Sequence, residues 1–261
     1  GNVTEINFEK KKFIFHPSSV DITKRKPDGK RTFLAKLLPV GADSMEIDVA
    51  LKNGKKLAMA LDTGNAFFVT THKDSLERVG EWEPGKKAKY MGLAGVASGP
   101  VDTFYKRMED TVIFGVPVKS SVWDVIDLPS SDAEADGTVG FQFLKNFNIV
   151  IDYERRRVWL DNFTGSASNE EPASVGISGF TDSKTKRVVI ARVSPDSPAE
   201  AAGIKAGDHL LAIGDRDLTE SYSFRAIQNL VEGEKDSLVK LAVSRNGQLK
   251  RYELKRIPLV N

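Results

Sequence analysis

The chain has 261 residues, of which 40% are hydrophobic and 28% charged, and its net charge is +2. This length allows one or two domains, and no apolar run approaches the roughly 18 residues that cross a bilayer. The lack of cysteine excludes disulfides, thiol nucleophiles and cysteine-based metal sites. The three histidines are widely scattered and no Gly-rich phosphate loop is present, so we expect neither a metal nor another cofactor.

The first 42 residues are basic, with nine Lys and Arg against four acidic residues. A basic arm can contact nucleic acid or an anionic membrane. Phe8, Phe13 and Phe15 are interleaved with the charges, however, as in an edge strand with a solvated face. We therefore expect this segment to add strands to the first domain or to lie at a dimer interface, and we expect no nucleic-acid partner.

Residues 43–128 predict a series of short strands. Residues 45–64 alternate between apolar and polar, turn at Asn53-Gly54 and alternate again. Asn-Gly between two alternating runs predicts a two-residue hairpin turn, because both central positions of a type I′ turn take positive φ. The same pattern recurs around Gly115.

Residues 130–137 form a polar loop, after which residues 141–147 predict a short helix and residues 149–161 predict two strands joined by a charged turn. These patterns define a mainly β domain over residues 1–163. The small and polar residues 164–172 predict a flexible linker.

The remaining residues, 173–261, are enough for a second, small domain. They contain strand patterns, a hairpin at Asn246-Gly247 and a helix with one apolar face, formed by Phe224, Ile227, Leu230 and Val231.

Residues 190–218, IARVSPDSPAEAAGIKAGDHLLAIGDRDL, resemble the central stretch of a bacterial PDZ domain, and the resemblance extends over about residues 173–257. It implies a β-sandwich or partial barrel with two helices, which binds an extended peptide or a C-terminus as an added strand. It also implies a loop whose backbone N–H groups capture the peptide carboxylate, at Val175, Gly176, Ile177 and Ser178. The alternative is a PDZ fold that only braces another domain.

Residues 57–71, LAMALDTGNAFFVTT, place an aspartate between two apolar runs. A tight turn between two strands is the simplest explanation. The stretch also resembles the active-site loop of retropepsin-like aspartic proteases. That resemblance implies that Asp62 activates water, that Thr63 anchors the loop to its symmetry mate, and that Gly64 lets two loops approach back to back. Asn65 departs from the Ala or Ser usual in these families, and its amide can supply an additional hydrogen bond.

Two further stretches agree with this resemblance, which covers about residues 38–162 and implies a closed or nearly closed β-barrel. Residues 137–160 resemble the downstream element that packs beneath the active loop, with Val139 and Gly140 at its centre and Thr138 where an apolar residue is usual. Residues 89–102 form a Gly-rich hairpin in the place of a flap, with these candidate flap residues: Gly92, Leu93, Ala94 and Gly95. The family pattern also has a non-catalytic aspartate at the position of Asp152.

Asp-Thr-Gly occurs once, whereas aspartic protease chemistry needs two carboxylates that share a proton. The sequence therefore predicts an aspartic endopeptidase whose second Asp62 comes from another copy in a homodimer, with polypeptide as substrate and the PDZ domain recruiting or gating it. The alternative is a non-catalytic peptide-binding adaptor. Bacterial chains that join these two domains are commonly exported, so we expect a periplasmic or envelope location, with an export signal upstream of Gly1.

Overall fold

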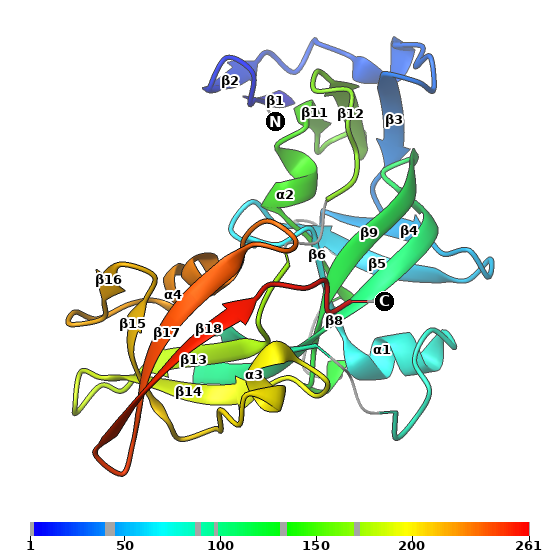
Figure 1. The fold of residues 1–261 in the computed structure, drawn as a ribbon. Coiled ribbons are helices and arrows are strands. Elements are labelled where there is room, and N and C mark those ends of the chain that lie inside the picture. The colour runs from blue at the N-terminus through cyan, green and yellow to red at the C-terminus, as the bar shows by residue number, and fades with distance from the viewer. Residues whose placement is uncertain are drawn as a thin grey trace. The chain divides into compact units, whose positions relative to one another are not determined.

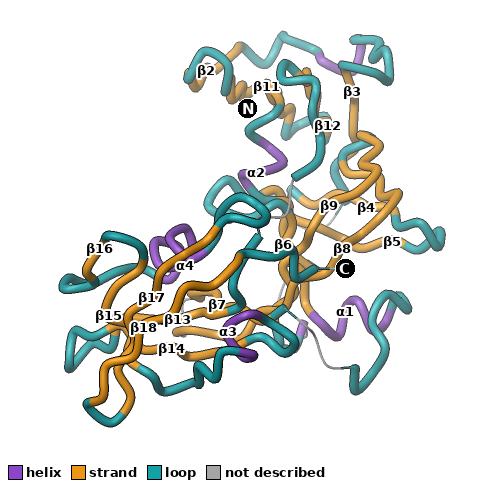
Figure 2. Tube along the Cα trace, in the orientation of Figure 1, coloured by secondary structure: helices purple, strands orange, loops and turns teal. Residues whose placement is uncertain are grey.

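The computed structural model describes residues 3–39, 45–86, 90–96, 99–130, 135–169 and 173–260. Strands dominate throughout, so the prediction of a mainly β fold is confirmed (Figures 1 and 2). The chain divides into two compact units, of which the first is Gly1–Pro84 with Arg107–Glu170 and the second is Gly85–Lys106 with Glu171–Asn261. The sequence instead assigned residues 85–106 to the N-terminal domain together with the rest of residues 1–163.

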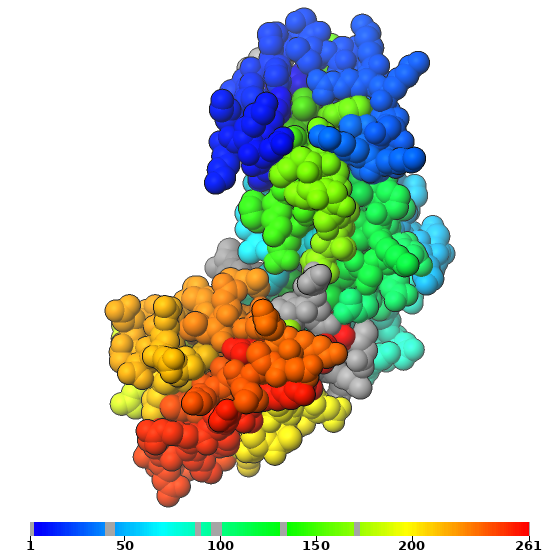
Figure 3. Space-filling model, turned by 45° about the horizontal axis from the view of Figure 1, so that its top comes forward, coloured from blue at the N-terminus to red at the C-terminus, as the bar shows by residue number. Residues whose placement is uncertain are grey.

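The first unit contains a five-stranded sheet, in the order β2-β1-β11-β12-β3. Its strands are β1 (Val3–Asn7), β2 (Lys12–His16), β3 (Thr32–Lys36), β11 (Phe147–Asp152) and β12 (Arg157–Asn162), and the short 3-10 helix η1 (Ile22–Lys24) contacts β12. The N-terminal residues thus add strands to the first unit, as expected. β2 is an edge strand and leaves Phe13 and Phe15 exposed at 58% and 64%, and its residues lie on the surface drawn in Figure 3.

A second sheet closes into a barrel. Its consecutive neighbours are β4 (Glu46–Ala50), β5 (Lys56–Leu61), β10 (Gly137–Val139), β6 (Val69–His72), β9 (Val116–Ile126) and β8 (Gly99–Ile113). β4 pairs with β8 through Ala50 and Val112, which joins the first strand of this order to the last. Helix α1 (Lys73–Arg78) follows β6, and helix α2 (Phe141–Leu144) follows β10.

The strands of the barrel form where apolar and polar residues alternate with a period of two. In β5 the residues Leu57, Met59 and Leu61 are buried and alternate with more exposed ones, because successive side chains of a strand point to opposite faces. Phe143 of α2 is also fully buried, and its ring contacts three other aromatic rings, those of Phe68, Phe114 and Phe147. Burying each such side chain contributes roughly 1.5–3 kcal/mol.

One local prediction for this unit was wrong in detail, and one helix was missed. The hairpin between β4 and β5 exists, but Gly54 has φ +82° while Asn53 is not in the left-handed region, so the turn is not type I′. Phe114-Gly115 does have two positive φ values and joins β8 to β9 directly. Helix α1 was not predicted, because six residues are too few for a clear helical period.

The second unit contains a sheet in the order β13-β14-β15-β17-β18, with β16 paired to β15. Its strands are β13 (Ile177–Thr181), β14 (Val188–Val193), β15 (His209–Ile213), β16 (Arg216–Asp217), β17 (Leu238–Arg245) and β18 (Gln248–Lys255), and its helices are α3 (Pro198–Ala201) and α4 (Phe224–Val231). Both helices begin at a serine cap: Ser197 accepts from the N–H of Glu200, and Ser223 from that of Ala226.

The core of this unit lies between the sheet and α4. Ile227 and Val231 of α4 are fully buried against strand residues such as Ile190 and Leu241. The unit also holds β7 (Met91–Val96), which pairs antiparallel with the first half of β8. One of the points at which the chain passes between the two units falls within β8, between Lys106 and Arg107.

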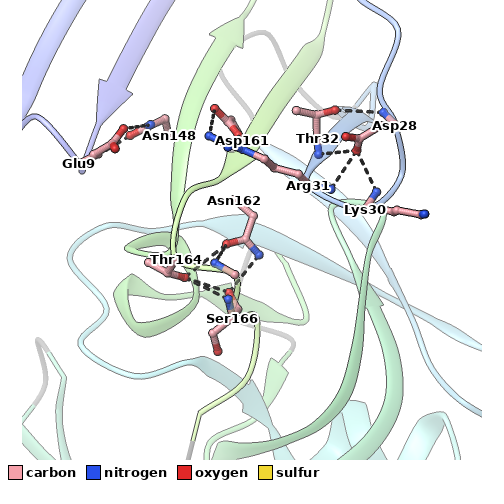
Figure 4. Close-up of polar contacts among 11 residues, drawn as sticks. Glu9, Asp28, Lys30, Arg31, Thr32, Asn148, Asp161, Asn162, Thr164 and Ser166 are labelled. Atoms are coloured by element: carbon pink, nitrogen blue, oxygen red, sulfur yellow. Dashed lines mark hydrogen bonds and ion pairs between the residues drawn. The ribbon is translucent and has the colours of Figure 1, made fainter.

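The described part of the predicted linker is bonded within the first unit rather than a free coil. Thr164 donates to the side chain of Asn146. Asn162 donates to the carbonyl of Ser166 (Figure 4). Asn169 pairs with the backbone of Val122 in both directions, at 2.8 and 3.0 Å. Residues 170–172 lie outside the described part of the chain.

Candidate active-site loop and peptide groove

Asp62 lies directly after the last residue of β5, in a loop anchored by backbone hydrogen bonds. Its N–H donates to the carbonyl of Val139 at 3.0 Å, so the loop is tied to the end of β10. Its Oδ1 accepts the N–H of Gly64 at 2.8 Å. Asp62 is half-buried, whereas Thr63 and Gly64 are exposed. The loop is thus fixed on its inner side and leaves its tip at the protein surface.

Asn65 holds the loop through its side chain. Its Nδ2 donates to Thr138 Oγ1 at 2.8 Å and to Thr70 Oγ1 at 3.0 Å, and its Oδ1 accepts the N–H of Phe67 at 2.9 Å. One side chain therefore satisfies three polar partners from β10, β6 and the loop itself. The additional hydrogen bonding expected of Asn65 is present.

Gly140 lies against the back of the same loop. A Cβ at this position would lie 2.3 Å from the carbonyl oxygen of Phe67 and 2.8 Å from that of Asn65. The N–H of Gly140 donates to Phe68, and the N–H of Phe141 donates to Asn65 at 2.7 Å. Val139 and Gly140 thus lie together with the Asp62 loop, and only glycine fits the approach. Their functional roles stay predictions.

Asp136 is a supporting residue that the sequence analysis missed. Its carboxylate accepts the N–H of Ala58 at 2.9 Å and the hydroxyl of Ser75 at 3.1 Å, and it forms an ion pair with Arg78. It connects β5 to α1 at the start of β10. The only signal available was its place directly before the Gly137-Thr138 stretch. Asp152 is 1% exposed and pairs with Arg155 at 2.9 Å, a structural arrangement.

The candidate flap is a hairpin. Gly92 pairs with Thr103, Leu93 with Asp102, Ala94 with Val101 and Gly95 with Pro100. Residues 97–98 lie outside the described part of the chain. The hairpin groups with the second unit, and a role as a flap over Asp62 stays a prediction.

The predicted carboxylate-capture loop leads into β13, which is the edge strand of the second unit's sheet. Gly176 has φ +85°, and a Cβ on it would lie 2.3 Å from Cβ of Ser197. Its carbonyl accepts the N–H of Ser194 at 2.7 Å, and the carbonyl of Val175 accepts that of Ala199. Hydrogen bonds accepted by its carbonyl groups therefore fix the loop to the residues that follow β14 and to α3. Ile177 and Ser178 are buried as well.

In the described ranges no helix is long and apolar enough to cross a membrane. The same residues contain no cluster of three or more His, Asp or Glu side chains with the geometry of a metal site.

Residues 168–255 match the family model of the PDZ domain. The second unit thus contains a PDZ domain, as the sequence predicted. A sequence search of curated proteins gave no match.

Solved structures that are similar to all or part of the chain include the following three. The photosystem II D1 C-terminal processing protease is 26% identical over 35% of this chain, with a TM-score of 0.32, and the match spans 24% of that protein. A retropepsin-like aspartic protease from Rickettsia conorii is 18% identical over 49% of this chain and 98% of its own, with a TM-score of 0.36. The serine endoprotease from Yersinia pestis is 13% identical over 99% of this chain and 94% of its own, with a TM-score of 0.32. These scores are too low to establish a shared overall fold.

Proposed function

We propose that the chain is an aspartic endopeptidase whose catalytic pair forms when the Asp62 residues of two copies meet across a two-fold axis. The observation that carries the proposal is the arrangement of the Asp62 loop. Its inner side is fixed by Val139, Asn65 and Gly140, while Thr63 and Gly64 are exposed and available to a second copy. An isologous contact at this tip would bring the two carboxylates together.

The chemistry follows from that pairing. One carboxylate is ionised and takes a proton from water, whose oxygen attacks the peptide carbonyl carbon. The other is protonated and donates to the carbonyl oxygen. Collapse of the tetrahedral intermediate breaks the C–N bond, and the amine leaves with a proton from the pair. The residues of this chain would orient the water and hold the shared proton, and no metal is required for this sequence of steps.

The PDZ domain supplies the peptide-binding part of the proposal. PDZ domains bind extended peptides by strand addition, and β13 is an edge strand. A substrate held there would be presented to Asp62 at a raised local concentration.

We further propose that the protein is exported to the periplasm or cell envelope, which fractionation of cells that express the full gene product would test.

Asp62→Asn tests the catalytic proposal, because it keeps the side chain's shape and removes the acid. We expect loss of cleavage of internally quenched peptides with little change in melting temperature, while Asp217→Asn, at an exposed position, retains activity. If the pair spans two copies, an excess of Asp62→Asn protein should inhibit the parent by forming mixed dimers. Undiminished cleavage by Asp62→Asn would refute the catalytic role of Asp62. The alternative function, a non-catalytic peptide-binding adaptor, would then remain.

A further inference from the structure

The hairpin formed by β7 and β8 lies against the peptide-binding side of the PDZ domain. Within the second unit, β7 contacts β13, β14 and α4. The match to the PDZ family implies a peptide groove bordered by an edge strand and a helix, which in this unit are β13 and α4. Figure 2 shows β7 beside β13. Among the described residues, β7 pairs with β8, and β13 has β14 as its only ladder neighbour.

Met91 is held at the start of β13 by two serine hydroxyls. Its N–H donates to Ser194 Oγ at 3.1 Å, and its carbonyl lies 3.3 Å from Ser178 Oγ and 3.4 Å from Ser194 Oγ. Ser178 belongs to the predicted capture loop, and Ser194 donates its own N–H to the carbonyl of Gly176. Ser178 is only 2% exposed and Ser194 is fully buried. A peptide cannot reach these hydroxyls while Met91 is in place.

Tyr90 is a buried tyrosine whose hydroxyl forms specific hydrogen bonds with side chains at the end of α4. It is 3% exposed, and its hydroxyl accepts from Gln228 Nε2 at 2.8 Å and lies 3.4 Å from a carboxylate oxygen of Glu232. Gln228 also donates to Glu232 at 2.8 Å, so the two groups form one polar pocket at the end of α4. The ring of Tyr90 stacks on that of Tyr105 at 4.5 Å. Gln228 and Glu232 therefore meet the hydroxyl of a tyrosine, whereas the partner of the ring, Tyr105, belongs to β8 of the hairpin itself.

A third contact ties down the other strand of the hairpin. Asp102 of β8 forms an ion pair with Arg192 of β14 at 2.8 Å. The side chains are 33% and 40% exposed, so this contact contributes less than the buried ones. Among the contacts of the described residues, one buried tyrosine, one backbone site and one exposed ion pair thus join the hairpin to β13, β14 and α4.

We infer that Tyr90 and Met91 act as an intramolecular ligand at the capture end of the PDZ groove, and that an external peptide binds there by displacing them. The class of peptide follows from the pocket: one that presents a tyrosine to Gln228 and Glu232. The displaced segment is the hairpin that the sequence predicts as the flap. This inference rests on the peptide-binding part of the proposed function and not on Asp62, so its test involves no cleavage.

The probe is a fluorescein-labelled peptide with the sequence of residues 90–96, Tyr-Met-Gly-Leu-Ala-Gly-Val, titrated with the full chain. The parent should bind it weakly, because the apparent dissociation constant is raised by the small open fraction. Tyr90→Ala should bind at least about tenfold more tightly, since it loses the ring and the hydroxyl that close the hairpin. Tyr153→Phe, which alters an exposed tyrosine of the first unit, should bind like the parent.

Tyr90→Phe removes only the hydroxyl and keeps the test valid if Tyr90→Ala fails to fold. It should bind the probe more tightly than the parent and less tightly than Tyr90→Ala. A probe with Phe in place of Tyr should bind Tyr90→Ala several-fold more weakly than the original, because it leaves Gln228 without its partner. Equal affinity of the parent and the Tyr90 variants for the probe would overturn the inference, as would no binding to any of them.

Hydrogen exchange on the parent gives an independent readout. Excess probe should raise exchange at the amides of Met91 and Gly92 and lower it in β13. If the probe binds while Met91 and Gly92 stay as protected as before, the hairpin is a structural brace and the inference is wrong. In that case peptide binding, and the proposed function with it, would still stand.

Discussion

Asn65 donates a hydrogen bond to Thr138 across 2.8 Å, and both residues were noted in the sequence as departures from the retropepsin-like pattern that the Asp62 loop resembles. Each departure supplies the partner that the other needs. A threonine hydroxyl at position 138 would be a poorly satisfied polar group without the amide, and the amide would lack one of its two acceptors without the hydroxyl. The two departures therefore form one compensated arrangement beneath Asp62.

A double-mutant cycle should detect this compensation. We expect Asn65→Ala to lower the free energy of unfolding by about 1–3 kcal/mol, because it leaves two threonine hydroxyls and one backbone N–H unpaired. Thr138→Val should cost about 1 kcal/mol. The double variant should lose about 0.5–1.5 kcal/mol less than the sum of the single changes, measured by urea unfolding. Strict additivity would mean that the two side chains do not support each other.

Gly64 and Gly140 offer a matched pair of glycine substitutions. Gly140→Ala forces a Cβ against two carbonyl oxygens of the loop, so we expect it to destabilise the monomer by about 2 kcal/mol or more. Gly64→Ala places its Cβ 3.2 Å from Asp62 Oδ1, a tight contact with a side chain and not with backbone, and should destabilise the monomer much less than Gly140→Ala.

The same pair tests the dimer. If two Asp62 loops meet back to back, the added methyl of Gly64→Ala lies at the contact and should abolish both cleavage and dimerisation in analytical ultracentrifugation. A Gly64→Ala protein that dimerises and cleaves like the parent would contradict a contact at this tip.

The local features of the PDZ unit were predictable because each one is encoded within a few residues. Ser197 followed by Pro198 gives a helix cap, and Asn246-Gly247 has the two positive φ values of a hairpin turn. The barrel strands were predictable from their two-residue alternation.

The environment of Tyr90 could not be predicted in the same way. Tyr90 and Gln228 are 138 residues apart, and no local period or turn signal links them. The Gly-rich stretch around Gly92 predicts a hairpin, but the sequence alone does not say which unit the hairpin packs on. Asp136 was missed for the same reason, since its partners come from β5 and α1.

Acid should weaken the second unit through Asp208. Arg245 holds the pKa of the Asp208 carboxyl below its usual range, aided by the N–H of Lys205. Because the folded pKa is the lower one, the stabilisation is present above the unfolded value of about 3.9 and is lost as pH falls through the folded value. Asp208→Asn should therefore lower unfolding free energy by about 2–4 kcal/mol near neutral pH and flatten its acid dependence.

Asp236→Asn is the control for this prediction. Asp236 also pairs with a cation, Lys255, at 2.6 Å, but both side chains are 56% exposed. Its removal should change unfolding very little, because exposed pairs are screened by water. Equal effects of the two substitutions would show that burial of Asp208 is not what gives its pair strength.

The last prediction concerns Glu232, whose carboxylate lies beside Tyr90 and Gln228. Burial raises the pKa of Glu232 above its ordinary value, and the hydrogen bonds from Gln228 and Tyr90 offset this in part. Since the folded pKa is the higher one, the ionised group costs stability above the folded pKa, and the cost disappears as pH falls below the unfolded value. Glu232→Gln keeps an acceptor for both partners and removes the charge. We expect it to stabilise the second unit near neutral pH by on the order of 1 kcal/mol.

The pH dependence separates this effect from simple repacking. The advantage of Glu232→Gln over the parent should shrink as pH is lowered toward the ordinary pKa of a glutamate, because the raised pKa lets Glu232 of the parent take up a proton before an exposed glutamate does. Glu234→Gln makes the same chemical change at an exposed position two residues away and should follow the parent at every pH. An advantage that does not vary with pH would mean that the charge of Glu232 costs nothing. The hydrogen bond to Tyr90 would then be as strong with the carboxylate as with the amide, and closing of the hairpin would be independent of pH.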